Sequence, residues 1–158
     1  MFQTILVPLD LNQEAVIDSV FKTVKSAAAP DPAHIVLLTV IPDIDVGGFP
    51  YVKTEYLEQI GDKARAHLEG IAREQLGDTH TWEVDVRIGP VARTIVNRAD
   101  HFDANLIVLA SHNPAFWDVL LGSIATQVVK NAHRSVLVVR QSKDGAQAKD
   151  PTDVSRDA

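Results

Sequence analysis

Short apolar runs of strand-forming residues alternate with helical patterns along this chain, and that alternation constrains the fold more than any other feature. Four runs are nearly free of polar residues, at 4–10, 34–41, 105–110 and 135–140. Runs without a polar face are typical of parallel strands that are buried on both sides of a sheet. Parallel strands need a crossover after each strand, so the segments between the runs are expected to be helices.

Residues 13–28 place Val16, Val20 and Val24 four apart, which is the apolar stripe of an amphipathic helix. Shorter helical patterns follow Pro90 and begin again near residue 123. The chain therefore reads as strictly alternating strands and helices, which predicts an open parallel sheet with helices on both faces.

A longer amphipathic helix is predicted for residues 52–76. Gly77 ends it, because glycine is favoured just past a helix C-terminus. Its apolar side is expected to carry Tyr56, Ile60, Ala64, His67 or Leu68, and Ile71.

The third strand differs from the others because it alternates apolar and polar residues. Period two with one polar face predicts an edge strand or a half-exposed strand. The apolar face is Trp82, Val84, Val86 and Ile88, and the polar face is Glu83, Asp85 and Arg87.

In open parallel sheets, ligands bind outside the carboxyl ends of the strands, where the strand order reverses. Two strand ends here carry residues suited to binding, Pro8 to Asp10 after the first strand and Ala110 to Asn113 after the fourth. Gly122 and Ser123 then stand at the start of a helix. This pair either caps the helix or lets its free N–H groups bind a phosphate. The pattern is not a P-loop, because no Gly-Lys-Ser/Thr follows the strand.

The chain has 158 residues, 46% of them hydrophobic, which suits one domain with a real core. Residues 141–158 hold one valine and no other large apolar residue, so the predicted division is a domain over 1–140 and a disordered polar tail. A net charge of −6 argues against a nucleic-acid binder. The absence of cysteine fits a reducing cytoplasm, and the N-terminus resembles neither a signal peptide nor a membrane span.

Five segments together resemble the universal stress protein family. They are ILVPLD, HIVLLTVI, IGPVARTIV, LIVLASHNP and LLGSIATQVVKNAHRSVLVVR, in the family's order and spacing from about Phe2 to Arg140. Nucleotide-binding members of that family carry G-x2-G-x9-G-S/T after the fourth strand. Here Ala110 and Asn113 replace the first two glycines. Eight residues, one fewer than in the family pattern, separate Asn113 from Gly122. The loop resembles a sub-group with A-S-H-x-P in this place, which implies that ATP binding is retained.

The resemblance implies a five-stranded sheet of order 3-2-1-4-5 and ATP, with or without Mg²⁺, at the carboxyl ends of strands one and four. The adenine and ribose would lie against Pro8, Leu9, Asp10 and Val40. Any Mg²⁺ would be held mainly by the phosphates, without a dedicated metal cage. The implied set is completed by residues of the fourth strand, its loop and the next helix: Leu109, Ala110, Ser111, His112, Asn113, Gly122, Ser123 and Ile124.

Two of these residues keep a structural alternative. Asp10 either accepts hydrogen bonds from ribose hydroxyls or caps the first helix. His112 either meets a phosphate or has a structural role. No catalytic residue is predicted.

The resemblance further implies a homodimer that pairs through Ser135 to Arg140, or a tetramer, because an apolar edge strand is an open template for pairing. The leading hypothesis is a cytoplasmic regulator that acts through nucleotide-dependent contacts with a protein partner. The first alternative is a dimeric interaction module without nucleotide. The second is a slow ATPase or a protein that phosphorylates itself. Neither nucleic acid nor direct membrane insertion is expected.

Overall fold

Five parallel strands form one sheet in the computed structural model, which describes residues 1–43, 50–111 and 121–140, without the side chains of 50–53. The strands are β1 (Thr4–Pro8), β2 (His34–Ile41), β3 (Thr81–Ile88), β4 (Leu106–Ser111) and β5 (Ser135–Arg140). Their order is β3-β2-β1-β4-β5. This confirms the predicted fold class and strand order.

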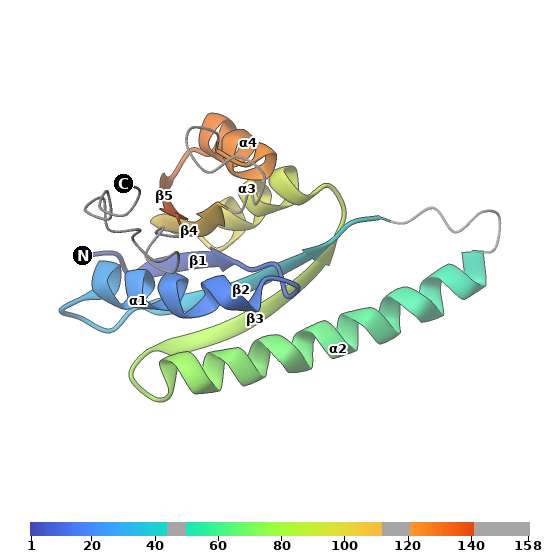
Figure 1. Ribbon diagram of the computed structural model, residues 1–158, viewed down its shortest axis with the longest axis horizontal. Helices are drawn as coiled ribbons and strands as arrows, with labels where there is room; N and C mark the ends of the chain where they lie inside the picture. The colour runs from blue at the N-terminus through green and yellow to red at the C-terminus, as the bar shows by residue number, and fades with distance from the viewer. Residues whose placement is uncertain (44–49, 112–120, 141–158) are drawn as a thin grey trace, which may run out of the picture.

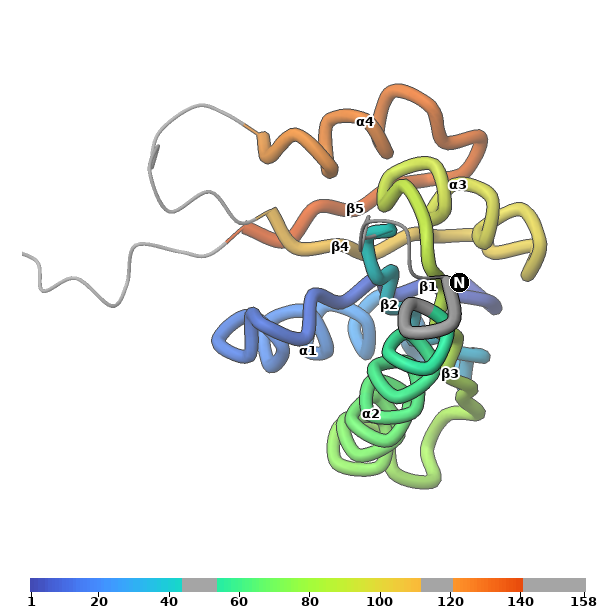
Figure 2. The backbone as a smooth tube through the Cα atoms, turned by 90° about the vertical axis from the view of Figure 1, so that its right-hand side faces the viewer, coloured from blue at the N-terminus to red at the C-terminus, as the bar shows by residue number. Residues whose placement is uncertain are grey.

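The helices cover both faces of the sheet, so the molecule has three layers (Figures 1 and 2). On one face lie α1 (Ile17–Ala28) and α2 (Pro50–Leu76), and on the other lie α3 (Val91–His101) and α4 (Ser123–Asn131). A 3-10 turn at Glu14–Val16 precedes α1. The helix predicted from residue 13 therefore starts as a tighter turn and becomes α-helical four residues later.

The hydrophobic core is split by the sheet into two layers. Ile5 and Val7 of β1 face α1 and α2, where they meet Phe21, while Leu6 faces α3 and α4. All four of these side chains are fully buried. Burying each large apolar side chain stabilises the fold by about 1.5–3 kcal/mol, so the central strands anchor both helix layers.

The first half of α2 departs from the prediction for its apolar side. Tyr56 is 47% exposed and Ile60 is only half-buried, and full burial begins at Ala64. Leu68, not His67, faces the core. The reason is length, since the first turns of α2 run past the carboxyl ends of the strands (Figure 1).

The outer strand β3 also departs from the simple polar-face prediction. It lies at one edge of the sheet, as expected, but Asp85 on its polar face is only 6% exposed. Its carboxylate accepts hydrogen bonds from Nε of Arg98 at 2.6 Å and from Nε of Arg87 at 2.8 Å. The polar face is therefore buried in part, because α3 supplies a cation to cover it.

The tail predicted for residues 141–158 lies outside the described residues, so the domain boundary at residue 140 stays a prediction. Within the described ranges, no helix combines the length and the apolar character needed to cross a bilayer.

Candidate functional site

The strand order reverses between β1 and β4, which are paired in the middle of the sheet. From β1 the chain crosses to β2 on one side, while β4 lies on the other side. The carboxyl ends of these two strands are therefore the place where an open α/β sheet binds a ligand. Pro8 and Ser111 are the last residues of β1 and β4.

The backbone that follows β1 is held firmly against β2. The N–H of Leu9 donates to the carbonyl of Leu38 at 2.8 Å. The buried hydroxyl of Thr39 donates to the carbonyl of Leu9 at 2.9 Å. These two bonds fix the point from which Asp10 projects.

Asp10 is exposed and closes a turn with its own side chain. Its Oδ1 accepts the N–H of Asn12 at 3.0 Å, and its carbonyl accepts the N–H of Gln13 at 3.0 Å. Within the described residues its second carboxylate oxygen has no hydrogen-bond partner. The first helical turn has Gln13 as its N-cap residue, so the helix-capping role given as the alternative for Asp10 is not observed. One carboxylate oxygen of Asp10 remains available to accept from a ligand hydroxyl.

A hydrogen bond joins the end of β4 to the start of α4. Ser111 Oγ accepts the N–H of Gly122 at 3.3 Å. Gly122 is the N-cap residue, and as a glycine it has no side chain with which to cap the helix. The first helical bond runs from the N–H of Thr126 to the carbonyl of Gly122 at 2.9 Å. The N–H groups of Ser123, Ile124 and Ala125 therefore lack acceptors within the helix, and they carry its positive dipole end.

Arg140 is a candidate that the sequence prediction missed. It is the register partner of Ser111 across β4 and β5. Val136 and Val138 of β5 pack in the core layer under α3 and α4, so Arg140, two residues further on, faces that same side. The side chain is exposed, and no carboxylate pairs with it among the described residues. Only the strand register could reveal this cation, since it is far from Ser111 in the sequence.

The predicted site residues do not all share one face of the sheet. Val40 and Leu109 pack in the layer under α3 and α4, on the side of Ser111. Leu9 and Ala110 pack in the layer under α1 and α2. Only the backbone of the latter two is therefore placed to border a ligand on the Ser111 side.

The remaining predicted residues have mixed outcomes. Ser123 is the first residue of α4 and is exposed, and Ile124 is 42% exposed beside it. His112 and Asn113 lie outside the described residues, so their predicted phosphate contacts stay predictions. The A-S-H-x-P sub-group assignment also stays a prediction, because family membership alone does not test it.

An open parallel α/β sheet binds ligands at its switch point, and a helix that begins there offers N–H groups that suit an anion. The chain belongs to the universal stress protein family, whose family model matches residues 1–140.

Individual relatives agree with this membership. Universal stress protein G of Escherichia coli O157:H7 is 30% identical over 145 residues, which cover 89% of this chain and all of the relative. Among solved structures, the protein MJ0577 matches with a TM-score of 0.78 at 25% identity, over 90% of this chain and 98% of its own. Universal stress protein UspA from Lactobacillus plantarum matches with a TM-score of 0.64 at 25% identity, over 87% and 97%.

Some solved universal stress proteins of this fold contain adenine nucleotides. One is in complex with cAMP, one from Archaeoglobus fulgidus is in complex with dAMP, and one from Arabidopsis thaliana has AMP bound. These proteins share 22%, 18% and 14% identity with this chain, so the likeness to them shows the fold alone.

Proposed function

We propose that this chain is a regulatory protein that binds ATP at the carboxyl ends of β1 and β4. The observation that carries the proposal is the hydrogen bond from the N–H of Gly122 to Ser111 Oγ. It holds an uncapped helix N-terminus against the end of a strand at the switch point of the sheet. A phosphate there would meet free N–H groups and the positive end of α4.

The place where the end of β4 meets the start of α4, here called the Ser111–Gly122 corner, suits the polyphosphate of ATP better than a neutral ligand. The N–H groups of Ser123 and Ile124 have no acceptor within the helix, and they favour negative charge, as does the guanidinium of Arg140. Arg140 can add a charge-assisted hydrogen bond to a phosphate oxygen. Mg²⁺, where present, would be coordinated mainly by the phosphates.

The nucleoside half of the ligand finds complementary groups on the neighbouring strand ends. Pro8 and Val40 offer apolar surface to an adenine ring, and the free carboxylate oxygen of Asp10 suits a ribose hydroxyl. The AMP, cAMP and dAMP complexes of family members support an adenine nucleotide as the ligand class. ATP and Mg²⁺ are our extension of that support.

We infer that the nucleotide acts by changing contacts with a protein partner, in the cytoplasm, where ATP is abundant. The alternative, slow ATP hydrolysis or self-phosphorylation, can be distinguished from this regulatory hypothesis by the products that it forms. Incubation with ATP should leave the nucleotide intact under the regulatory hypothesis, and accumulation of ADP or of phosphorylated chain would favour the alternative.

Gly122→Val tests the site directly. The backbone of Gly122 has φ −54° and ψ 153°, which any residue can adopt, so the fold should persist. The new side chain would stand over the helix N-terminus and exclude a phosphate. Calorimetric titration with ATP should therefore show binding by the natural chain and a loss of at least about tenfold in the variant.

The matched control is Gln127→Val, an exposed position in the middle of α4. It should bind ATP like the natural chain. Equal affinity for ATP in the natural chain and in Gly122→Val would show that the helix N-terminus does not take part in ATP binding.

Homodimerisation through β5 belongs to the same proposal. β5 is the edge of the sheet opposite β3, and its four central residues are only half-buried. Among the described residues no strand lies beyond it. An apolar strand with a free edge is suited to pairing with a second copy about a two-fold axis.

A further inference from the structure

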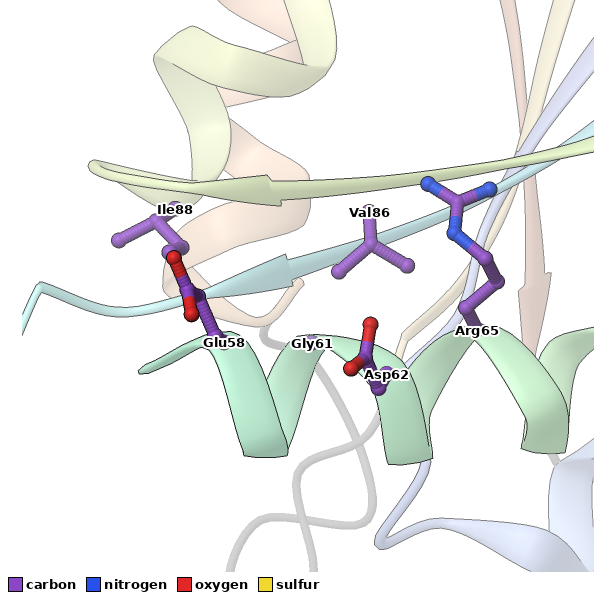
Figure 3. Close-up of a pocket in the computed structure, with 6 residues that line it drawn as sticks. All are labelled: Glu58, Gly61, Asp62, Arg65, Val86 and Ile88. Carbon is purple, nitrogen blue, oxygen red and sulfur yellow. The ribbon is translucent and has the colours of Figure 1, made fainter. Parts of the chain in front are cut away.

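A groove lies between the first half of α2 and the outer edge of β3, away from the Ser111–Gly122 corner. It is open to solvent and has a volume of about 300 Å³. Val86 and Ile88 point from the strand toward the helix, and Glu58 and Asp62 point back toward the strand (Figure 3). The lining is completed by Gly61 and Arg65.

Among the described residues, no strand pairs with the outer edge of β3 along this groove. The carbonyl of Val84 accepts Nη1 of Arg65 at 3.3 Å, so it points away from β2. The N–H of Gly89 instead donates to Ile41 of the β2 side at 2.9 Å. Because alternate residues of a strand direct their N–H and C=O groups to the same side, the backbone groups of Val86 and Ile88 also point outward. The edge from Val86 to Ile88 is therefore open to another strand.

The floor of the groove is apolar. Ile88 is 46% exposed, and Val86 is half-buried. This surface is exposed because the first half of α2 runs past the core, as Tyr56 and Ile60 show. An occupant gains by covering it, at about 25 cal/mol for each Å² removed from water.

The rim of the groove is acidic. Among the described residues, neither Glu58 nor Asp62 forms an ion pair. Lys63 follows Asp62 directly but does not line the groove. Arg65, the cation that does line it, is turned to the Val84 carbonyl. The groove therefore presents two unpaired carboxylates above an apolar floor and beside a free strand edge.

We propose that this groove binds an extended, basic segment of a partner protein, which adds a strand to β3. Backbone pairing with Val86 and Ile88 would direct alternate side chains of the segment toward α2. A lysine or arginine at those positions would lay its aliphatic stem on Val86 and Ile88 and bring its charge to Glu58 and Asp62. The matching chemistry is a strand with basic residues at every second position.

A second copy of this chain fits less well. Pairing of two β3 edges about a two-fold axis would bring the two acidic rims to the same interface, and like charges oppose such an interface. Charge complementarity therefore selects a basic partner segment over self-association.

The test uses a fluorescent, end-capped peptide of sequence TKTKTKT and the full chain, with binding followed by anisotropy. The natural chain should bind this peptide. It should bind the isomer TTKKKTT, which has the same charge but no alternation, at least about tenfold more weakly. Methylation of the backbone nitrogens blocks one hydrogen-bonding edge of the peptide when it is made at the lysines and the other edge when it is made at the threonines. One of these two methylated peptides should lose binding.

Gly61→Leu fills the groove. A Cβ at Gly61 meets no atom within 4 Å, and leucine favours helix over glycine, so the fold should be retained. The variant should bind TKTKTKT at least about tenfold more weakly. Gly70→Leu is the matched control, because Gly70 also lies in α2 with open space around it but does not line the groove.

A second pair of variants tests the charges. Glu58→Gln with Asp62→Asn should weaken binding, whereas Glu55→Gln with Glu74→Gln, which removes equal charge elsewhere on α2, should not. The proposal is overturned if the natural chain does not bind TKTKTKT, or if both pairs weaken binding equally. It is also overturned if Gly61→Leu lowers the sedimentation mass without any peptide binding, since the groove would then join two copies of the chain.

Discussion

At the scale of single residues, Asp85 joins the outer strand to α3. Its carboxylate side chain is 8% exposed and pairs with Arg98, which is 15% exposed. Asp85→Ala would leave Arg98 without its closest counter-charge. Breaking such a buried pair costs about 3 kcal/mol, so urea denaturation should show a loss of that size in the free energy of unfolding.

Asp100→Ala is the control for that change. Asp100 pairs with Arg134 at 3.3 Å but is 42% exposed, so its loss should cost no more than about 1 kcal/mol. Equal losses in the two variants would show that burial does not set the strength of the Asp85 pair.

Arg140 yields a prediction about ligand charge. If its guanidinium meets a phosphate, Arg140→Gln should weaken ATP binding at least about tenfold, because a charge-assisted hydrogen bond contributes about 1.5–3 kcal/mol. Adenosine, which has no phosphate, should bind both proteins equally. Calorimetry with the two ligands measures this, and equal weakening for adenosine would place Arg140 away from the phosphates.

The sequence predicted which strand ends carry the candidate site, but it did not show which way each side chain points. Leu9 and Ala110 pack on the side of α1 and α2, whereas Val40 and Ser111 lie on the other side. Side-chain direction depends on the strand's register within the sheet. Register is set by contacts between distant segments, so the approach of Arg140 to Ser111 could not be read from local pattern either.

At the scale of elements, the end of α2 depends on the backbone of Gly77. Its φ of +52° lies in the left-handed region, which costs other residues about 1–2 kcal/mol. Gly77→Ala should therefore lower the free energy of unfolding by about that amount, as measured in urea.

Gly70→Ala is the opposite case on the same helix. Gly70 lies inside α2, where alanine favours the helix by about 0.5–1 kcal/mol and meets no atom within 4 Å. This variant should gain stability. A gain in both variants would mean that the left-handed conformation is not required at Gly77.

The periodicity of the sequence predicted the four α-helices of the described residues, but not how much of each helix is covered by other elements. For α2 it indicated one continuous apolar side that includes Tyr56 and Ile60. A pattern of period 3.6 shows which residues share a face, yet burial depends on whether another element lies opposite that face. The first turns of α2 extend beyond the carboxyl ends of the strands, so no strand lies opposite them. How far the helix and the strands reach relative to each other is determined only in the folded structure.

At the scale of the whole molecule, the strand order 3-2-1-4-5 followed from the family resemblance, since alternation of strands and helices alone allows several orders. That order leaves β3 and β5 as the two edges. We propose that β5 pairs with a second copy and that β3 receives a basic strand, so the two edges would have different partners.

Leu137→Pro tests the β5 pairing. Leu137 lies in the middle of β5 and packs against the core layer under α1 and α2. Proline removes a backbone donor there and breaks the strand. Sedimentation and circular dichroism should show that the dimer is lost, together with the fold, and a native-like dimer would contradict the β5 interface.

The central claim is that the corner formed by Ser111 and Gly122 binds ATP. Equilibrium dialysis of the full chain against labelled ATP with Mg²⁺ tests it most directly. We predict near-stoichiometric, saturable binding that unlabelled ATP displaces. No saturable uptake would contradict the claim, and the uncapped start of α4 would then be only the end of a helix in a dimeric interaction module.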